Sequence, residues 1–237
     1  MITPLNSFSR QGYEWLIRKG LKEGFSYLPL DGRTTTGKII FLRHDVDFSL
    51  ECALKIAESN SELGVNSTFF VMLSNPFYNL FESESRMKLS KIKDMGHTIS
   101  LHYDETQYVE KHFGLEIELK CFKNLTGCEP EIISLHRPSK SFLENRWTEQ
   151  VGVRTTYDKE YFNDITYLSD SAKKFDHERT IQELERRGQE RRIQLLLHPL
   201  WWSKNEESST NRIIDEIIDS RKNSLEQWSK INCKSYL

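Results

Sequence analysis

The sequence has few cysteines, and their spacing excludes two common kinds of site. Cys52, Cys121, Cys128 and Cys233 are dispersed over 237 residues and form no Cys-x-x-Cys pair. Neither a disulfide framework nor a thiolate zinc site is therefore indicated. We expect all four to be structural, since free cysteine is commonly a small buried apolar residue.

Long apolar runs and a strong charge of one sign are also missing. No run approaches the roughly 20 residues that a membrane-spanning helix needs, and residues 1–10 lack the apolar core of a signal peptide. The formal net charge of −2 gives no general attraction to nucleic acid or to an anionic membrane. The sequence favours a cytoplasmic protein with no nucleic-acid partner and no stable membrane insertion.

Strand-like and helical patterns alternate along most of the chain, which has only six prolines and eleven glycines. Strands are predicted at 38–42, 67–73, 98–101, 131–135, 153–156, 165–168 and 193–197. Helices are predicted at 10–23, 50–63, 87–95, 108–125, 178–187 and 211–228. This alternation indicates parallel strands joined by crossovers. We therefore predict an α/β fold, a distorted or partial (β/α) barrel of about seven parallel strands, with residues 1–237 as a single domain.

Ionisable side chains follow five of the predicted strands, and in a parallel sheet all of these strand ends lie on one rim. The residues are Asp45 and Asp47, His102 and Asp104, His136 and Arg137, Asp170, and His198. Asp45 and Asp47 share a face if the strand continues, and two such carboxylates repel unless a cation or a proton separates them. The pattern predicts a metal site, with helix capping as the alternative explanation for the acidic residues.

The same segments resemble the motifs of the polysaccharide deacetylases, which are the family 4 carbohydrate esterases with NodB homology. The resemblance covers residues 38–202 and rests on Arg43-His44-Asp45-Val46-Asp47, the segment 96–102, Arg137-Pro138 and Leu196-Leu197-His198. It is particularly similar to a subgroup associated with surface-polysaccharide gene clusters, which carries His-Asp-Val-Asp, His-Arg-Pro, Ser-Asp-Ser and His-Pro with Trp-Trp.

The resemblance implies an activity and a cofactor. The expected protein is a metal-dependent hydrolase of carbon–nitrogen bonds other than peptide bonds, with Zn²⁺ as the ion. It would remove an N-acetyl group from an amino sugar. With a cytoplasmic location, the expected substrate is a small-molecule or lipid-linked precursor of a surface glycan.

The resemblance also implies roles for individual residues. Asp45 corresponds to the general base, His198 to the general acid, and Asp47 and His102 to metal ligands. Arg137 is expected to hold Asp45 ionised and oriented, because a guanidinium can bind a carboxylate at two places.

Asp170 corresponds to an acidic residue of the family that supports the arginine or the catalytic histidine. A helix cap is the alternative role for this residue.

One position departs from the family pattern and leaves the third metal ligand open. The family places a second histidine four residues after the first, but Thr106 stands there, and a threonine hydroxyl is a poor zinc ligand. His136 or Asp104 could replace it, or the metal could be bound weakly or not at all. We favour His136, because Asp104 with Gln107 three residues later also forms a capping-box-like helix start.

Three aromatic residues are candidates for substrate binding. Trp201 and Trp202 come shortly after His198, and Tyr157 follows another strand. They could stack on a sugar ring or bury an acyl methyl group, and packing at the barrel rim is the alternative.

Two other functions remain open from the sequence. One is a catalytically silent sugar-binding descendant of the family, and the other is a hydrolase of a different carbon–nitrogen bond, as in a cyclic imide or ureide. The sequence does not indicate the oligomeric state.

Overall fold

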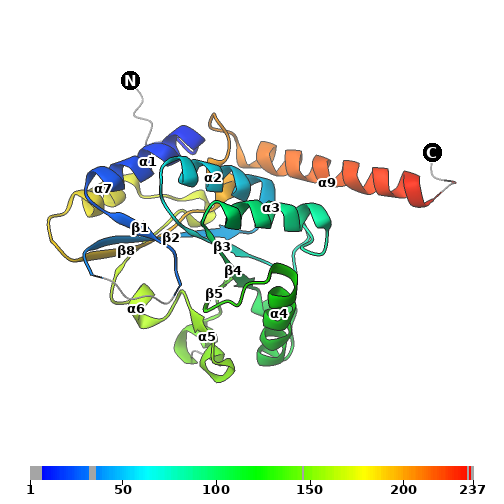
Figure 1. The fold of residues 1–237 in the computed structure, drawn as a ribbon, viewed down its shortest axis with the longest axis horizontal. Helices are drawn as coiled ribbons and strands as arrows, with labels where there is room; N and C mark the ends of the chain where they lie inside the picture. Colours follow the sequence, from blue (N-terminus) through cyan, green and yellow to red (C-terminus); the bar gives the residue numbers. More distant parts are fainter. Residues whose placement is uncertain (1–6, 32–35, 146, 234, 236–237) are drawn as a thin grey trace.

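A curled sheet of parallel strands forms the centre of the molecule (Figure 1). The computed structural model describes residues 7–31, 36–145, 147–233 and 235. Its strands are β1 (Ser26–Leu28), β2 (Lys38–Val46), β3 (Thr68–Val71), β4 (Thr98–Tyr103), β5 (Ile132–Leu135), β6 (Arg154–Thr155), β7 (Thr166–Ser169) and β8 (Arg191–Leu196). Their order is β6-β5-β4-β3-β2-β8-β7, with β1 paired to β2.

The predicted fold class is confirmed. The seven predicted strands correspond to β2 through β8, and every pairing in the sheet is parallel. The order starts at β6 and stops at β7, which makes the sheet a partial barrel. The sequence pattern missed β1, because a three-residue strand is too short to show a period of two.

Helices surround the sheet, and the six predicted ones are all present. The helices are α1 (Arg10–Lys22), α2 (Leu50–Glu62), α3 (Ser83–Asp94), α4 (Lys111–Thr126), α5 (Lys140–Asn145), α6 (Lys159–Phe162), α7 (His177–Glu185), α8 (Pro199–Trp202) and α9 (Thr210–Asn232). Ser49 caps α2 by accepting a hydrogen bond from the Cys52 amide. Within the described ranges, no helix is long and apolar enough to cross a bilayer.

Strand β2 is buried on both of its faces, and this sets the direction of the site residues. Ile40 and Leu42 belong to the large core between the sheet and the helices. Ile39 and Phe41 point the other way, into a smaller apolar cluster with Phe70. Because side chains alternate along a strand, the later odd-numbered residues continue the second face toward the barrel rim.

Of the four cysteines, only Cys52 is buried. Cys52 lies in an apolar cluster near the start of α2, as expected for a structural residue. Cys121 and Cys128 are partly exposed and Cys233 is exposed, so burial does not explain their presence.

Candidate metal centre

Alternation along β2 brings Arg43 and Asp45 onto one face at the carboxyl end of the strand, and Asp47 follows directly after the strand ends at Val46. Arg43 Nε donates to Asp45 Oδ1 at 2.8 Å, and Arg43 Nη2 donates to Asp45 Oδ2 at 2.6 Å. Both side chains are buried. Burial alone raises the pKa of Asp45, but the Arg43 charge outweighs it and lowers the pKa below its usual value. Asp45 is therefore held ionised at the rim.

Further polar groups fix the Arg43 guanidinium. Arg43 Nη1 donates to Gln194 Oε1 at 3.0 Å, and Nη2 also donates to the Ser134 hydroxyl. Tyr157 lies behind it, with its hydroxyl 3.4 Å from Nη2 and its ring centroid 5.3 Å from the guanidinium carbon. This shell leaves the arginine little freedom to turn away from Asp45.

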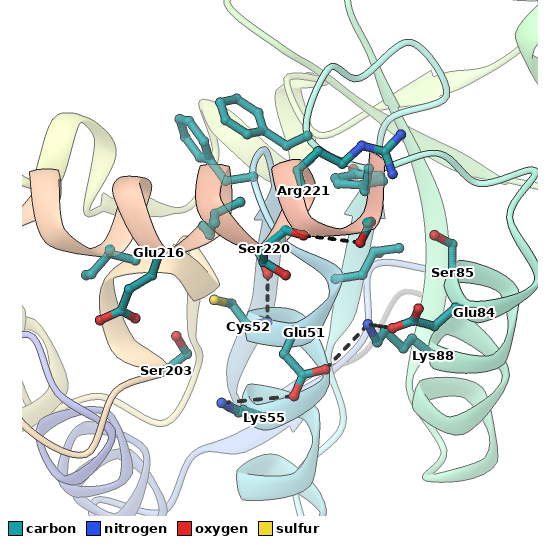
Figure 2. A pocket seen from close by; sticks show the side chains of 18 of the residues that line it. Glu51, Cys52, Lys55, Glu84, Ser85, Lys88, Ser203, Glu216, Ser220 and Arg221 are labelled. Atoms are coloured by element: carbon teal, nitrogen blue, oxygen red, sulfur yellow. Dashed lines mark hydrogen bonds and ion pairs between the residues drawn. The ribbon is translucent and has the colours of Figure 1, made fainter. Parts of the chain in front are cut away.

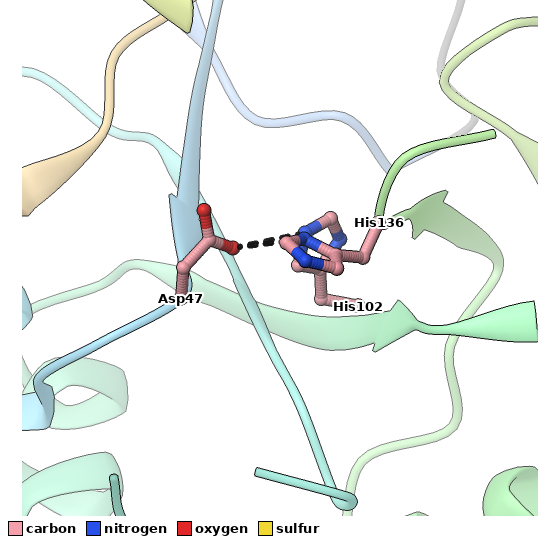
Figure 3. Close-up of side chains that lie close together, drawn as sticks. All are labelled: Asp47, His102 and His136. Carbon is pink, nitrogen blue, oxygen red and sulfur yellow. Dashed lines mark ion pairs between the residues drawn. The ribbon is translucent and has the colours of Figure 1, made fainter. Parts of the chain in front are cut away.

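Asp47, His102 and His136 lie close together (Figure 3). Their cluster borders the Arg43–Asp45 pair, because His102 Nε2 lies 3.7 Å from Asp45 Oδ2. Asp47 Oδ1 lies 3.2 Å from His102 Nε2 and 3.4 Å from His136 Nδ1. Two donors bound to one tetrahedral zinc ion at 2.0–2.1 Å would lie about 3.3 Å apart. Both distances from Asp47 match that value, and the three ligand atoms all lie within 4.8 Å of one another, as ligands of a single cation would.

The Asp47 carboxylate also fits a cation electrostatically. Its Oδ1 is buried and accepts no hydrogen bond within the described part of the chain, an expensive arrangement without a further partner. Burial raises the pKa of Asp47, but the close imidazoles of His102 and His136 lower it well below the usual value. One carboxylate and two imidazoles are a set of protein ligands that catalytic zinc sites use.

Asp104 is occupied elsewhere. Its Oδ1 accepts hydrogen bonds from the Thr106 amide at 3.0 Å and the Thr106 hydroxyl at 2.7 Å. Its Oδ2 accepts from Gln107 and from Arg137, each at 3.3 Å. Asp104 thus caps the short helix Glu105–Gln107, as the capping alternative predicted. His136 remains the candidate for the third ligand.

On the other side of Asp47, His198 forms a pair with Asp170. His198 Nδ1 lies 2.5 Å from Asp170 Oδ1, and Asp170 Oδ2 accepts a hydrogen bond from Trp202 Nε1 at 2.7 Å. Burial by itself lowers the pKa of His198, but the Asp170 charge and hydrogen bond outweigh it and raise the pKa to about 9. The other ring nitrogen, Nε2, lies 3.7 Å from Asp47 Oδ2, so the protonated His198 ring faces the cluster of Asp47, His102 and His136.

His44 holds the backbone that precedes His198. Its Nδ1–H donates to the Leu197 carbonyl at 2.9 Å, while Nε2 faces the Tyr13 hydroxyl and the Asn60 amide at 3.2 Å each. Burial lowers the pKa of His44 to about 3, so the ring is neutral. His44 lies on the opposite face of β2 from Asp45, as strand alternation predicts.

Three predicted contacts need correction. Arg137 does not hold Asp45: its side chain is 69% exposed, its φ is 51°, and its ion pair is with Asp104. Trp202 is only 1% exposed and binds Asp170, so it cannot stack on a sugar. Tyr157 is also buried, and its hydroxyl donates to the Leu135 carbonyl as well as facing Arg43.

Of the three predicted aromatic residues, Trp201 lies beside the candidate metal ligands. It is partly exposed and lines a small cavity together with Asp45, Asp47 and His198. The residue that sequence reasoning missed is Arg43. Its spacing of two residues from Asp45 on a buried strand was the available signal, since residues i and i+2 share a face.

Comparisons with known proteins gave similar solved structures only; neither the family models nor the curated proteins gave a match. A peptidoglycan deacetylase from Bacillus subtilis is 14% identical, covers 85% of this chain and 98% of its own, and has a TM-score of 0.49. A family 4 carbohydrate esterase from Bacillus anthracis is 19% identical, with coverages of 89% and 86% and a TM-score of 0.43. A mutant of a CE4 family pseudoenzyme is 16% identical, with coverages of 78% and 62% and a TM-score of 0.47.

Proposed function

We propose that the protein is a metal-dependent deacetylase that hydrolyses the N-acetyl group of an amino sugar. One observation carries the proposal: a three-residue ligand set lies between an ionised carboxylate and a protonated imidazole. Asp45 Oδ2 is 3.7 Å from the ligand atom of His102, and His198 Nε2 is 3.7 Å from Asp47 Oδ2. Amide hydrolysis needs a base and an acid on either side of a positive centre.

Asp47, His102 and His136 would hold the metal. A divalent cation bound there, Zn²⁺ by the nature of its donors, would activate water and stabilise negative charge on the amide oxygen. The motifs around these residues, which resemble those of the polysaccharide deacetylases, support the same assignment.

Asp45 acts as the general base in this proposal. The Arg43 guanidinium keeps it ionised and fixes its plane, so the carboxylate is ready to take a proton from the attacking water. Asp45 Oδ2 accepts from Arg43 Nη2 and also from the Ser134 hydroxyl at 3.3 Å, whereas Oδ1 accepts from Arg43 Nε. Since each oxygen of an ionised carboxylate can accept about two hydrogen bonds, Oδ1 has a lone pair for the water.

His198 acts as the general acid. Asp170 orients the ring through Nδ1 and keeps it protonated near neutral pH, which leaves Nε2–H to protonate the departing sugar nitrogen. Trp202 holds Asp170, and His44 holds the backbone at Leu197, so both position the acid from behind. Trp201 is the aromatic surface proposed to meet the sugar ring or the acetyl methyl.

The substrate class follows from the resemblance to the surface-polysaccharide subgroup. We propose a nucleotide- or lipid-linked amino sugar made for a surface glycan, with the deacetylation in the cytoplasm. Such a substrate presents one N-acetyl group to a rim that is only partly enclosed: Asp47, His136 and His198 side chains are 15 to 20% exposed.

The test is acetate release by zinc-loaded protein from a nucleotide-linked N-acetyl amino sugar, a lipid-linked one and an N-acetylglucosamine oligomer. Asp45→Asn should abolish release while the protein keeps its metal. Asp164→Asn removes an exposed carboxylate outside the site and should leave turnover unchanged. Ammonia or a ring-opened product without acetate would instead point to a different carbon–nitrogen hydrolase.

The catalytically silent alternative makes a different prediction. A silent sugar-binding protein would bind the same compounds without releasing acetate, even when its metal content is one ion per chain. That result would overturn the proposed activity and leave the metal assignment intact.

A further inference from the structure

Helix α9 starts against the body of the molecule and then projects away from it (Figure 1). In its first half, Ile213 is buried against Leu200 and Cys52, and Ile214 and Ile217 pack at the edge of this cluster. This half also forms one wall of a cavity of about 260 Å³ between α2, α3 and α9 (Figure 2).

Ion pairs fix the direction of the helix at this anchored end. Glu216 pairs with Lys204, and Arg221 Nη1 donates to Glu82 Oε1 at 2.9 Å. Residues beyond Arg221 therefore leave the body along a defined line and form an arm, residues 222–232.

The arm and the turn before it expose large apolar side chains. Ile218 is 49% exposed, Leu225 55%, Trp228 65% and Ile231 80%. Ile218, Leu225 and Trp228 are separated by seven and three residues, so they lie on one stripe of the helix, and Ile231 borders it. A helix of this kind is marginal in water unless its apolar stripe is covered.

The anchored end of the same stripe carries a groove. From α9 it is lined by the apolar Ile218 and Leu225 and by the polar Arg221, Lys222, Glu226 and Ser229, and Pro76 and Phe77 line it from the loop between β3 and α3. Its volume is about 450 Å³. One surface thus offers both a groove with apolar walls at Phe77 and Ile218 and apolar side chains at the end of the arm.

We propose that this surface binds a second copy of the chain through antiparallel pairing of the two α9 helices, with the twofold axis near Leu225. Trp228 and Ile231 of each copy would then lie over the groove beside Ile218 of the other. The arrangement is self-complementary, as a twofold interface requires.

The charges beside the stripe favour the antiparallel direction. Lys222 and Glu226 lie on the same flank, where they form a weak pair at 3.9 Å within one helix. Antiparallel pairing about Leu225 brings this flank of both copies to the same side of the interface and places Lys222 of one copy near Glu226 of the other, twice. In-register parallel pairing would put the two flanks on opposite sides of the interface, where these pairs do not form.

The polar face of α9 argues for a protein partner over a membrane. It carries Asp215, Asp219 and Glu226 as well as Lys222 and Lys230. Helices that lie on anionic membranes instead have polar faces rich in lysine and arginine. A second copy fits a surface of mixed charge.

The experiment is sedimentation equilibrium on the full chain and on two arm variants, Leu225→Glu and Trp228→Glu. The wild type should be dimeric at about 10 μM, and each variant should weaken the dimer by about 30-fold or more, as loss of a central apolar anchor does. The matched control is Phe113→Glu, which changes a similarly exposed aromatic residue on α4 and should stay dimeric.

A charge exchange tests the direction of pairing. Lys222→Glu should weaken the dimer, and adding Glu226→Lys in the same chain should restore it. Unchanged circular dichroism in all variants shows that α9 has not unfolded. A monomeric wild type overturns the proposal, and wild-type monomer that sediments with vesicles of anionic phospholipid would assign the arm to a membrane.

Discussion

Arg43 binds Asp45 through two parallel hydrogen bonds from the same strand, two residues away, and both side chains are buried. The motif resemblance gives this task to Arg137, which lies on a different segment and points to solvent. The strand itself fixes the direction of an arginine side chain inside β2, whereas the direction of an arginine side chain after a strand depends on the conformation of the loop. The proposed base is therefore oriented by the regular part of the fold.

The Arg43–Asp45 pair is expected to contribute to both stability and catalysis. Arg43→Gln would leave a buried carboxylate without its cation and lower the free energy of unfolding by about 3–5 kcal/mol. Arg43→Lys keeps a charge but loses the bidentate geometry, so kcat/KM should fall at least about tenfold. Urea unfolding and acetate release measure the two effects.

Arg137→Ala is the matched control for this prediction. Because Arg137 is largely exposed, its removal should change the free energy of unfolding by no more than about 0.5 kcal/mol. A loss as large as that of Arg43→Gln would contradict the pairing described above.

Zinc binding by single variants distinguishes the proposed metal ligands from the proposed base. Asp47→Asn, His102→Ala and His136→Ala should each weaken zinc binding by more than about 100-fold, because each removes a direct donor. Asp45→Asn and Asp104→Ala should retain zinc. Competition with a chromophoric chelator measures the affinity, and tight zinc binding by His136→Ala would remove that residue from the ligand set.

The pH dependence of turnover should report His198. As a general acid it must be protonated, and its pKa is raised from 6.5 to about 9, so kcat should fall as the pH rises through that value. A bound cation beside Asp47 adds positive charge and moves this limb to lower pH. His198→Ala should slow substrates with poor leaving amines by about 10²- to 10⁴-fold.

Asp170→Asn provides the complementary pH measurement. Without the Asp170 charge the His198 pKa falls toward its usual value, so the alkaline limb should move down by about one to two pH units. The ring keeps a hydrogen-bond partner in this variant. An unchanged limb would show that another group is the acid.

Glu118 should make the protein less stable at higher pH. It is buried on α4, where burial raises its pKa to about 7 although Tyr108 and Ser74 donate hydrogen bonds to it. A raised carboxyl pKa means that the folded state holds the proton more tightly, so stability falls as the pH rises from about 4.5 to 7.

Replacing Glu118 by Gln should abolish that dependence. The melting temperature of Glu118→Gln should exceed that of the wild type at pH 8 by more than it does at pH 5. Glu116→Gln, an exposed position on the same helix, is the control and should shift neither value. Equal shifts at both pH values would exclude titration of Glu118 as the cause.

The periodicity of the sequence was sufficient to predict the architecture. The alternation of strand and helix patterns predicted seven of the strands. It also predicted that they are parallel, because each crossover returns the chain to the end of the sheet at which the previous strand began. It also implied that residues after these strands share a rim, and Asp47, His102, His136 and His198 do lie together there. These features depend only on the periods of regular structure.

The partners of the side chains were decided only by the tertiary structure. Arg43 and Arg137 both belong to the motifs that resemble those of the family. The positive φ of Arg137 and its ion pair with Asp104 direct its side chain away from Asp45, and Arg43 binds Asp45 instead. Likewise, the local amides of Thr106 and Gln107 occupy Asp104 and leave the ligand position to His136. The sequence by itself determined which groups reach the rim, because strand direction is a backbone property. Hydrogen-bond competition in three dimensions decided which groups meet, because each polar atom binds the partner that the folded backbone brings within reach.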